Sequence, residues 1–303
     1  MDNLCHTLTG AACGEAGLKR LTRFGTPVLL IASNLPDIDV LGFAANTPAV
    51  ALRRGWTHGV AAQALLPVLL TGLVLLYDHL RPPPAGAPRA RAAPVLLLSY
   101  VGVLSHVGMD WLNSYGVRLL KPLSERWFYG DAVFIIDPWL WLMLGLGVLL
   151  ARRQRRPVAA LVAILAAIVY ITAMVLTARM SRQHVVEIWT ERHGRAPREL
   201  MVGPMPVTPL RRQVIIDTGD EYFTGRYHVR QGTLALDERP TPRNEDAPAA
   251  VRAREHERVR AVLIWARFPF YHLSPTDGGT TVALGDMRFP ARVGGINVFV
   301  PDE

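Results

Sequence analysis

The chain has 303 residues, of which 50% are hydrophobic, and its length is enough for about two domains. A net charge of +8 and a pI of about 10.0 would suit a nucleic-acid partner. The arginines, however, are scattered or lie at the ends of apolar runs, without the stripe of basic and aromatic residues that nucleic-acid binding favours. The composition therefore argues against nucleic acid.

The apolar residues are concentrated before about Thr177, and the rest resembles a soluble domain. We predict a helical membrane domain over residues 1–178 and an α+β domain over residues 179–303. The apolar stretches at residues 4–18 and 27–35 are too short to cross a bilayer. They are expected to form a helical hairpin that is covered by the rest of the bundle.

Longer apolar runs follow, and about 20 apolar residues are needed for a helix to span a bilayer. We predict four transmembrane helices, over residues 60–77, 94–109, 132–150 and 158–177. The predicted fold class is therefore mainly α, with about four spans and a short N-terminal hairpin, followed by the soluble α+β domain.

The short loops predict the orientation of these spans. Residues 81–93 and 152–156 carry arginines and no acidic residue, so the positive-inside rule places both loops in the cytoplasm. The C-terminal domain is then extracytoplasmic. Five basic residues fall on the outer side against the rule, which are Arg53, Arg54, Arg118, Lys121 and Arg126.

The pattern after Thr177 is typical of a small α+β domain. Alternating apolar residues flank Thr218-Gly219-Asp220, which predicts a hairpin. Helical spacing covers residues 249–267, and residues 238–248 are rich in proline and charge and predict a loop. The strands expected here are residues 213–217, 221–229, 280–284 and 296–300.

Polar side chains gather at the outer ends of the predicted helices. Ionisable groups beside apolar spans are costly and usually functional, and imidazoles with carboxylates suit borderline divalent metals. His106 and Asp110 are four residues apart, so they share one helix face. The candidate metal ligands are His6, Asp37, Asp39, His58, His106 and Asp110.

These residues predict a metal-dependent hydrolase. Zinc is the expected ion, with manganese or iron as alternatives, and six ligands would serve one ion or a pair suited to a phosphoester. In an extended turn Asp37 and Asp39 point opposite ways, so one binds metal and the other holds a histidine. Asp39 or Glu15 would accept a proton, and Arg54 would hold the anionic substrate.

Other interpretations stay open at this point. Asp37 alone is explained as an ordinary turn residue after Pro36, and a lone histidine such as His6 is as often structural as functional. A membrane protein of assembly or transport with a structural metal is the main alternative. Peptide hydrolysis is disfavoured because the chain lacks a His-Glu-x-x-His motif.

Several blocks of the first 150 residues resemble a bacterial inner-membrane family of predicted metal-dependent hydrolases that is also labelled LexA-binding. The blocks are Met1–His6, Gly14–Gly17, Asn34–Asp39, Arg54–His58, Leu104–Asn113 and Arg126–Asp131. Cys5 departs from the pattern, which usually has a small hydroxyl residue there.

The resemblance implies a multi-spanning protein of the bacterial inner membrane. It implies a hydrolase that resembles a phospholipase, acts among membrane lipids and takes an anionic lipid or lipid-linked substrate. The positions that match the family's motifs imply that the same six residues named above bind the metal. The LexA label concerns regulation and implies no DNA binding. The oligomeric state is left open.

Overall fold

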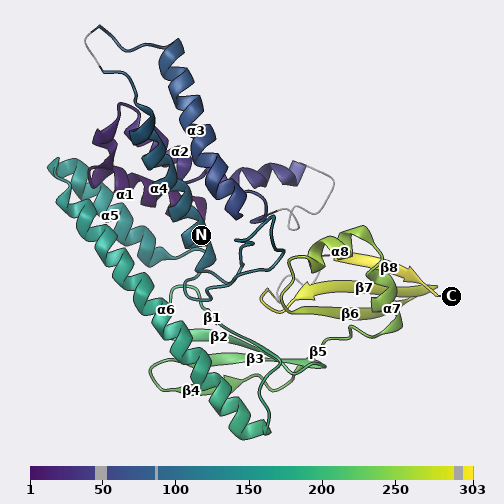
Figure 1. The fold of residues 1–303 in the computed structure, drawn as a ribbon. Coiled ribbons are helices and arrows are strands. Elements are labelled where there is room, and N and C mark those ends of the chain that lie inside the picture. Colours follow the sequence, from purple (N-terminus) through teal and green to yellow (C-terminus); the bar gives the residue numbers. More distant parts are fainter. Residues whose placement is uncertain (45–52, 86–87, 290–295, 303) are drawn as a thin grey trace. The chain divides into compact units, whose positions relative to one another are not determined.

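The computed structural model describes residues 1–44, 53–85, 88–289 and 296–302. The chain forms two compact units (Figure 1). The first, called the membrane unit, comprises Met1–Val40 and Arg53–Leu176. The second, called the C-terminal unit, comprises Leu41–Leu52 and Thr177–Glu303.

The first part of the chain is helical, as predicted. Its elements are α1 (Asn3–Glu15), η1 (Leu18–Leu21), α2 (Gly25–Ala32), η2 (Leu35–Ala44), α3 (Val60–Leu80), α4 (Ala92–Trp111), α5 (Pro138–Gln154) and α6 (Val158–His193). The short helices α1 and α2, joined through η1, form the expected N-terminal hairpin. The Asp2 carboxylate starts α1 by accepting the backbone N–H groups of Leu4 and Cys5.

Among the described residues, three helices are long and apolar enough to cross a membrane: α3, α4 and α6. The third predicted span begins later than expected, at Pro138 rather than at residue 132, and α5 has 17 residues. Asp137 caps this helix and Pro138 occupies its first turn, a combination that fixes a helix start. The preceding apolar residues Ala132 and Val133 are buried in a loop instead.

Close packing of α2 against α4 builds the interior of the membrane unit. Leu29, Ala32 and Leu98 are fully buried in this contact. Gly102 lies where the two helices approach most closely, since an added Cβ would overlap the Ala32 side chain and lie 2.8 Å from the Ser33 nitrogen. Gly108, on the same helix, has open space in that direction.

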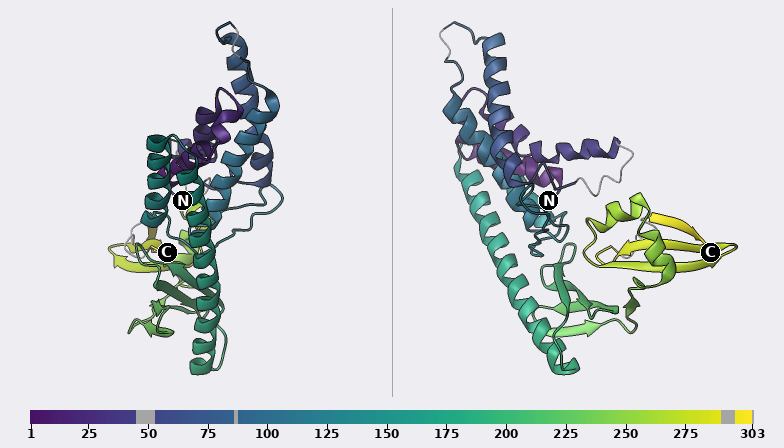
Figure 2. Two further views of the ribbon diagram at one scale, coloured as in Figure 1. Left: turned by 90° about the vertical axis from the view of Figure 1, so that its left-hand side faces the viewer. Right: turned by 45° about the vertical axis from the view of Figure 1, so that its right-hand side comes forward.

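The C-terminal unit is built on antiparallel sheets. One sheet has the order β1-β2-β3-β4, with β5 paired to β3, and the other has the order β6-β7-β8. The strands are β1 (Glu199–Pro204), β2 (Arg211–Asp217), β3 (Glu221–His228), β4 (Thr233–Leu236), β5 (Thr241–Pro242), β6 (Pro269–Thr276), β7 (Gly279–Asp286) and β8 (Ile296–Pro301). Figure 2 shows both sheets from further directions.

Much of the predicted pattern of this unit is present. The β2–β3 hairpin turns at residues 218–220, and β7 and β8 cover the two later predicted strands. The predicted helix over residues 249–267 is instead two helices, α7 (Pro248–Ala253) and α8 (Glu257–Leu263). His256 interrupts it, because its ring caps the start of α8 by accepting the Arg258 N–H.

Helix α6 extends well past its predicted end at residue 177. In the C-terminal unit its Val185 and Trp189 pack against Leu200 of β1 and Val214 of β2 in one buried core. This half of the helix contains many polar residues, so the hydropathy pattern did not predict it. Its apolar residues lie on one face, which packs on the sheet of β1–β4.

We predict that Gly102→Ala lowers the free energy of unfolding of the membrane unit by about 1–3 kcal/mol, because the methyl group forces α2 away from α4. Gly108→Ala is the matched control in the same helix, and it should leave stability equal or slightly higher. Thermal unfolding in detergent measures both. Equal destabilisation by the two variants would contradict the proposed close contact.

Candidate metal centre

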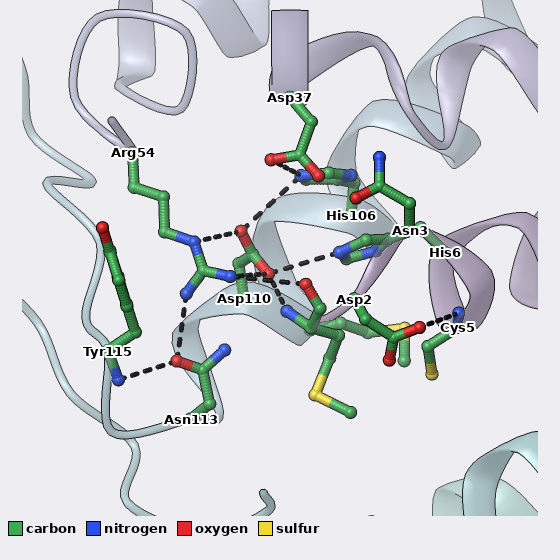
Figure 3. A network of polar contacts seen from close by, with 12 residues as sticks. Asp2, Asn3, Cys5, His6, Asp37, Arg54, His106, Asp110, Asn113 and Tyr115 are labelled. Carbon is green, nitrogen blue, oxygen red and sulfur yellow. Dashed lines mark hydrogen bonds and ion pairs between the residues drawn. The ribbon is translucent and has the colours of Figure 1, made fainter. Parts of the chain in front are cut away.

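Four of the six predicted ligands converge at one place in the membrane unit. Asp37 comes from η2, His58 from the turn before α3, and His106 and Asp110 from the last two turns of α4. One donor atom from each lies within 4.8 Å of the others, and all four residues are buried. Figure 3 shows Asp37 and His106 beside Asp110. Such a set of imidazoles and carboxylates is a suitable cage for a divalent metal.

The His106 imidazole has a fixed orientation. Its Nδ1 lies 2.8 Å from the backbone carbonyl oxygen of Ser33. A carbonyl only accepts hydrogen bonds, so Nδ1 carries the proton and donates it. In the neutral ring Nε2 then has a free lone pair, which is directed into the cluster.

Asp39 and Thr57 fix the His58 imidazole in the same way. The Thr57 hydroxyl donates to Asp39 Oδ2 at 2.9 Å, so its oxygen accepts from His58 Nδ1, also at 2.9 Å. Asp39 Oδ2 lies 3.6 Å from His58 Nδ1 and also accepts the Arg54 backbone N–H. Asp39 therefore orients a ligand, the role expected of one of the two turn carboxylates.

With both rings held this way, acceptor atoms face one another. His58 Nε2 lies 3.2 Å from His106 Nε2, and the two nitrogens lie 3.2 and 3.6 Å from Asp110 Oδ2. Burial lowers the pKa of His58, so a proton on this ring is disfavoured. A cation between the acceptors removes their mutual repulsion, and the residues present thus fit a metal ion.

Asp110 is the most heavily bonded residue of the cluster. Arg54 binds it with two nitrogens, Nε at 2.8 Å from Oδ2 and Nη2 at 2.9 Å from Oδ1 (Figure 3). The remaining Arg54 nitrogen donates to Asn113 Oδ1 at 3.0 Å, and the Met1 amino group also contacts Asp110. The donors of Arg54 are thus engaged with Asp110 and Asn113, and its predicted role in holding the substrate stays a prediction without support in this geometry.

His6 approaches from α1. Its Nε2 lies 3.3 Å from Asp110 Oδ1, and its ring stacks on His106 with centroids 3.7 Å apart. Burial lowers the pKa of His6 to about 3, so the ring is neutral. His6 contacts Asp110 Oδ1, whereas His58 and His106 approach Oδ2. His6 therefore lies beside the group of four and is not one of its members. Within the described residues, this group of four is the one set of three or more such side chains that lie close enough together to hold an ion.

Glu15 is not brought to the cluster. It lies at the end of α1, where its carboxylate pairs with Lys19 and Arg152. Burial opposes ionisation there, but hydrogen bonds from these two cations hold the pKa of Glu15 below its usual value. The proposed proton-accepting role of Glu15 therefore has no support in the geometry.

Two supporting groups escaped the sequence interpretation. The Ser33 carbonyl has no signal in a sequence, since any residue carries one. Thr57 could have been found, because a hydroxyl next to a candidate ligand is a common means of orienting it. Arg53 lies at the edge of the cluster, where its guanidinium pairs with Asp37 at 3.2 Å and Asp39 at 3.6 Å.

Comparisons with known proteins place this cluster in context. A family model described as YdjM inner membrane protein matches residues 1–179, which include the whole centre. The uncharacterized protein YfhP of Bacillus subtilis strain 168 is 25% identical over 151 residues, which are 47% of this chain and 43% of that protein. The chain thus covers less than half the length of this relative. No solved structure matches the chain.

We predict that Arg54→Ala destabilises the metal-free membrane unit by about 3–5 kcal/mol, because it leaves Asp110 buried without its bidentate partner. Arg54→Lys should fall between this variant and the wild type, since an ammonium cannot form both bonds. Arg53→Ala is the control, as its partly exposed pairs contribute about 0–1 kcal/mol. Thermal unfolding with a chelator present measures all three; similar losses for Arg53→Ala and Arg54→Ala would refute the assignment.

Proposed function

We propose that the membrane unit of this chain, which belongs to the YdjM family of inner membrane proteins, is a metal-dependent hydrolase. One divalent ion, zinc by the ligand types, is held by Asp37, His58, His106 and Asp110. The observation that carries the proposal is the pair of Nε2 atoms 3.2 Å apart, each turned inward by a partner on Nδ1. Manganese and iron are alternatives that accept the same ligands.

The charges around the centre favour an anionic substrate. The carboxylates of Asp37, Asp39 and Asp110 are opposed by the two guanidinium groups of Arg53 and Arg54, which leaves the side chains one negative charge in excess. A divalent ion reverses this excess to one positive charge. A phosphoester in a lipid or lipid-linked molecule is a substrate of the right sign, and it is present where spans leave the membrane.

The residues of the chain have separate roles in this proposal. A divalent ion, when bound, supplies Lewis acidity and activates water for attack on the ester. Arg54 keeps the Asp110 carboxylate turned toward the histidines, and Asp39 keeps the His58 lone pair directed inward. Asp39 also lies beside Arg53, whose position at the edge makes it the better candidate for contact with a substrate anion.

The site is proposed to lie at the outer face of the inner membrane. The arginine-rich loops 81–93 and 152–156 mark the cytoplasmic ends of the helices, and the ligands lie at the opposite ends of α3 and α4. On this topology α5 is the third predicted span and α6 the fourth, and the C-terminal unit is extracytoplasmic. Membrane lipids are then both the surroundings and the source of substrate.

A specific observation favours one alternative, which is a structural metal site in an assembly or transport protein. His58, His106 and Asp110 have no exposed surface, and closed coordination is typical of structural ions. This alternative predicts that any loss of function follows a loss of thermal stability. The hydrolase proposal requires a variant that retains metal and stability but loses turnover.

Metal content tests the centre directly. We expect one ion per chain in detergent-purified wild type by mass spectrometry, and none in His58→Ala or Asp110→Ala, since each loses a ligand of the four. Glu15→Gln is the matched control, and it should keep the ion because Glu15 pairs elsewhere. A wild type without metal after loading would exclude the proposed centre.

Asp39→Asn distinguishes the enzyme from the structural alternative. The amide oxygen can still accept from Thr57, so we expect the ion and the unfolding temperature to be retained while phospholipid headgroup release falls about 10–100-fold. The assay uses mixed phospholipid vesicles with added metal. Equal headgroup release by wild type, Asp39→Asn and His58→Ala would rule out phospholipid hydrolysis.

A further inference from the structure

The segment from Val117 to Phe128, between α4 and α5, forms a closed excursion of the chain. Val117 and Phe128 exchange two backbone hydrogen bonds, at 3.0 and 2.9 Å, which join its ends. The excursion packs on the turn that carries His58, because the Arg118 N–H donates to the Arg54 carbonyl at 2.9 Å. Gly59 allows this contact, since a Cβ there would overlap the Lys121 backbone.

The tip of the excursion exposes large apolar side chains. Leu123 is 82% exposed and Leu120 43%, and the neighbouring Trp56 is 57% exposed. Leucines on α3 face outward because lipid surrounds a span, but these two lie in a loop. Apolar and tryptophan side chains grouped at the end of a span are typical of residues that enter the membrane interface.

Cations surround this apolar tip. Arg118, Lys121 and Arg126 are accompanied by one acid, Glu125, which pairs with the first two. The cations lie over aromatic rings: Lys121 Nζ is 4.7 Å from the Trp56 ring centre, and Arg126 Cζ is 5.3 Å from that of Phe128. The rings hold the charged ends near the apolar tip. Arg126 is exposed and the Lys121 side chain is 11% exposed, so Arg126 presents most of the accessible charge beside the apolar surface.

The positive charge of the excursion also accounts for the basic residues that the positive-inside rule does not explain. Five basic residues lie opposite the arginine-rich loops, against the positive-inside rule. The structure uses Arg53 and Arg54 to neutralise carboxylates of the metal centre. The other three are all in the excursion, where they exceed the acidic residues by two, and the metal centre does not use them.

The excursion begins shortly after α4 ends at Trp111, and it packs at Gly59, next to the first residue of α3. Both helices are apolar enough to cross a membrane, so the excursion lies at the level where two spans leave the bilayer. Lipid headgroups are the molecules found at this level. We propose that the excursion is a binding surface for anionic phospholipid, with Leu120 and Leu123 entering the interface and Lys121 and Arg126 contacting the headgroup phosphates.

A fluorescent label tests this contact in a bilayer. The probe is NBD on Leu123→Cys, in a background with Cys5→Ser and Cys13→Ser, reconstituted in nanodiscs of phosphatidylcholine and phosphatidylglycerol. Nitroxide quenchers are attached near the headgroup of either lipid. We expect blue-shifted emission and stronger quenching by labelled phosphatidylglycerol than by labelled phosphatidylcholine.

The Lys121→Gln/Arg126→Gln double variant then tests the charges. Each basic residue near an anionic surface changes the local lipid preference by about fivefold, so the preference for phosphatidylglycerol should disappear. Arg230→Gln/Arg239→Gln removes the same charge from exposed positions of the C-terminal unit and should keep the preference. For the wild-type charges, aqueous, unquenched emission or equal quenching by both lipids would overturn the proposal. It would also be overturned if the Lys121→Gln/Arg126→Gln variant kept the preference, or if the Arg230→Gln/Arg239→Gln variant lost it.

The proposal does not rest on the hydrolase assignment. Metal content and headgroup release report on the centre at His58 and Asp110, whereas quenching reports on the excursion. If the protein binds no metal but shows the lipid preference, this proposal stands and the metal centre is excluded. If it binds metal and shows no lipid preference, the metal centre stands and this proposal is excluded.

Discussion

The centre of the membrane unit depends on one electrostatic constraint, which is that three acceptor groups converge in a fully buried space. The Nε2 atoms of His58 and His106 and the Asp110 carboxylate repel one another unless a cation lies between them. The surrounding contacts preserve this arrangement. The Ser33 carbonyl and the pair Asp39 and Thr57 decide which ring nitrogen is protonated, and Arg54 fixes the carboxylate.

The helix packing follows from the same need. Ser33 directly follows α2, so its carbonyl reaches His106 only if α2 lies close against α4, and Gly102 permits that approach. Helices α3 and α4 are antiparallel neighbours, which brings the turn before α3, with His58, to the last turns of α4. The hairpin of the short helices α1 and α2 places His6, and through the following η2 also Asp37, at the end of α4.

The sequence was informative where apolar length or ligand chemistry dominates. Uninterrupted apolar runs predicted α3 and α4, and the i, i+4 spacing of His106 and Asp110 predicted a shared face. The sequence did not predict the contacts of a charged side chain that has several possible partners. Arg54 was predicted to hold the substrate and Glu15 to accept a proton. Arg54 is instead held by Asp110, and Glu15 pairs with Lys19 four residues away and with Arg152, a contact that arises from tertiary packing. The later start of α5 has a local cause, the Asp137-Pro138 cap, which apolar composition hides.

The family match bears on how the two units divide the work. It ends at residue 179, within α6, and it contains every residue of the metal centre but no strand of the C-terminal unit. The centre's ligands and their orienting partners also all lie in the membrane unit. The chemistry proposed for this chain is therefore complete without the sheets. The sheet of β1–β4 has its own buried core, to which α6 contributes Val185 and Trp189, and the sheet of β6–β8 has another. All the strands therefore lie beyond the residues that the family model matches, and they are joined to them through α6.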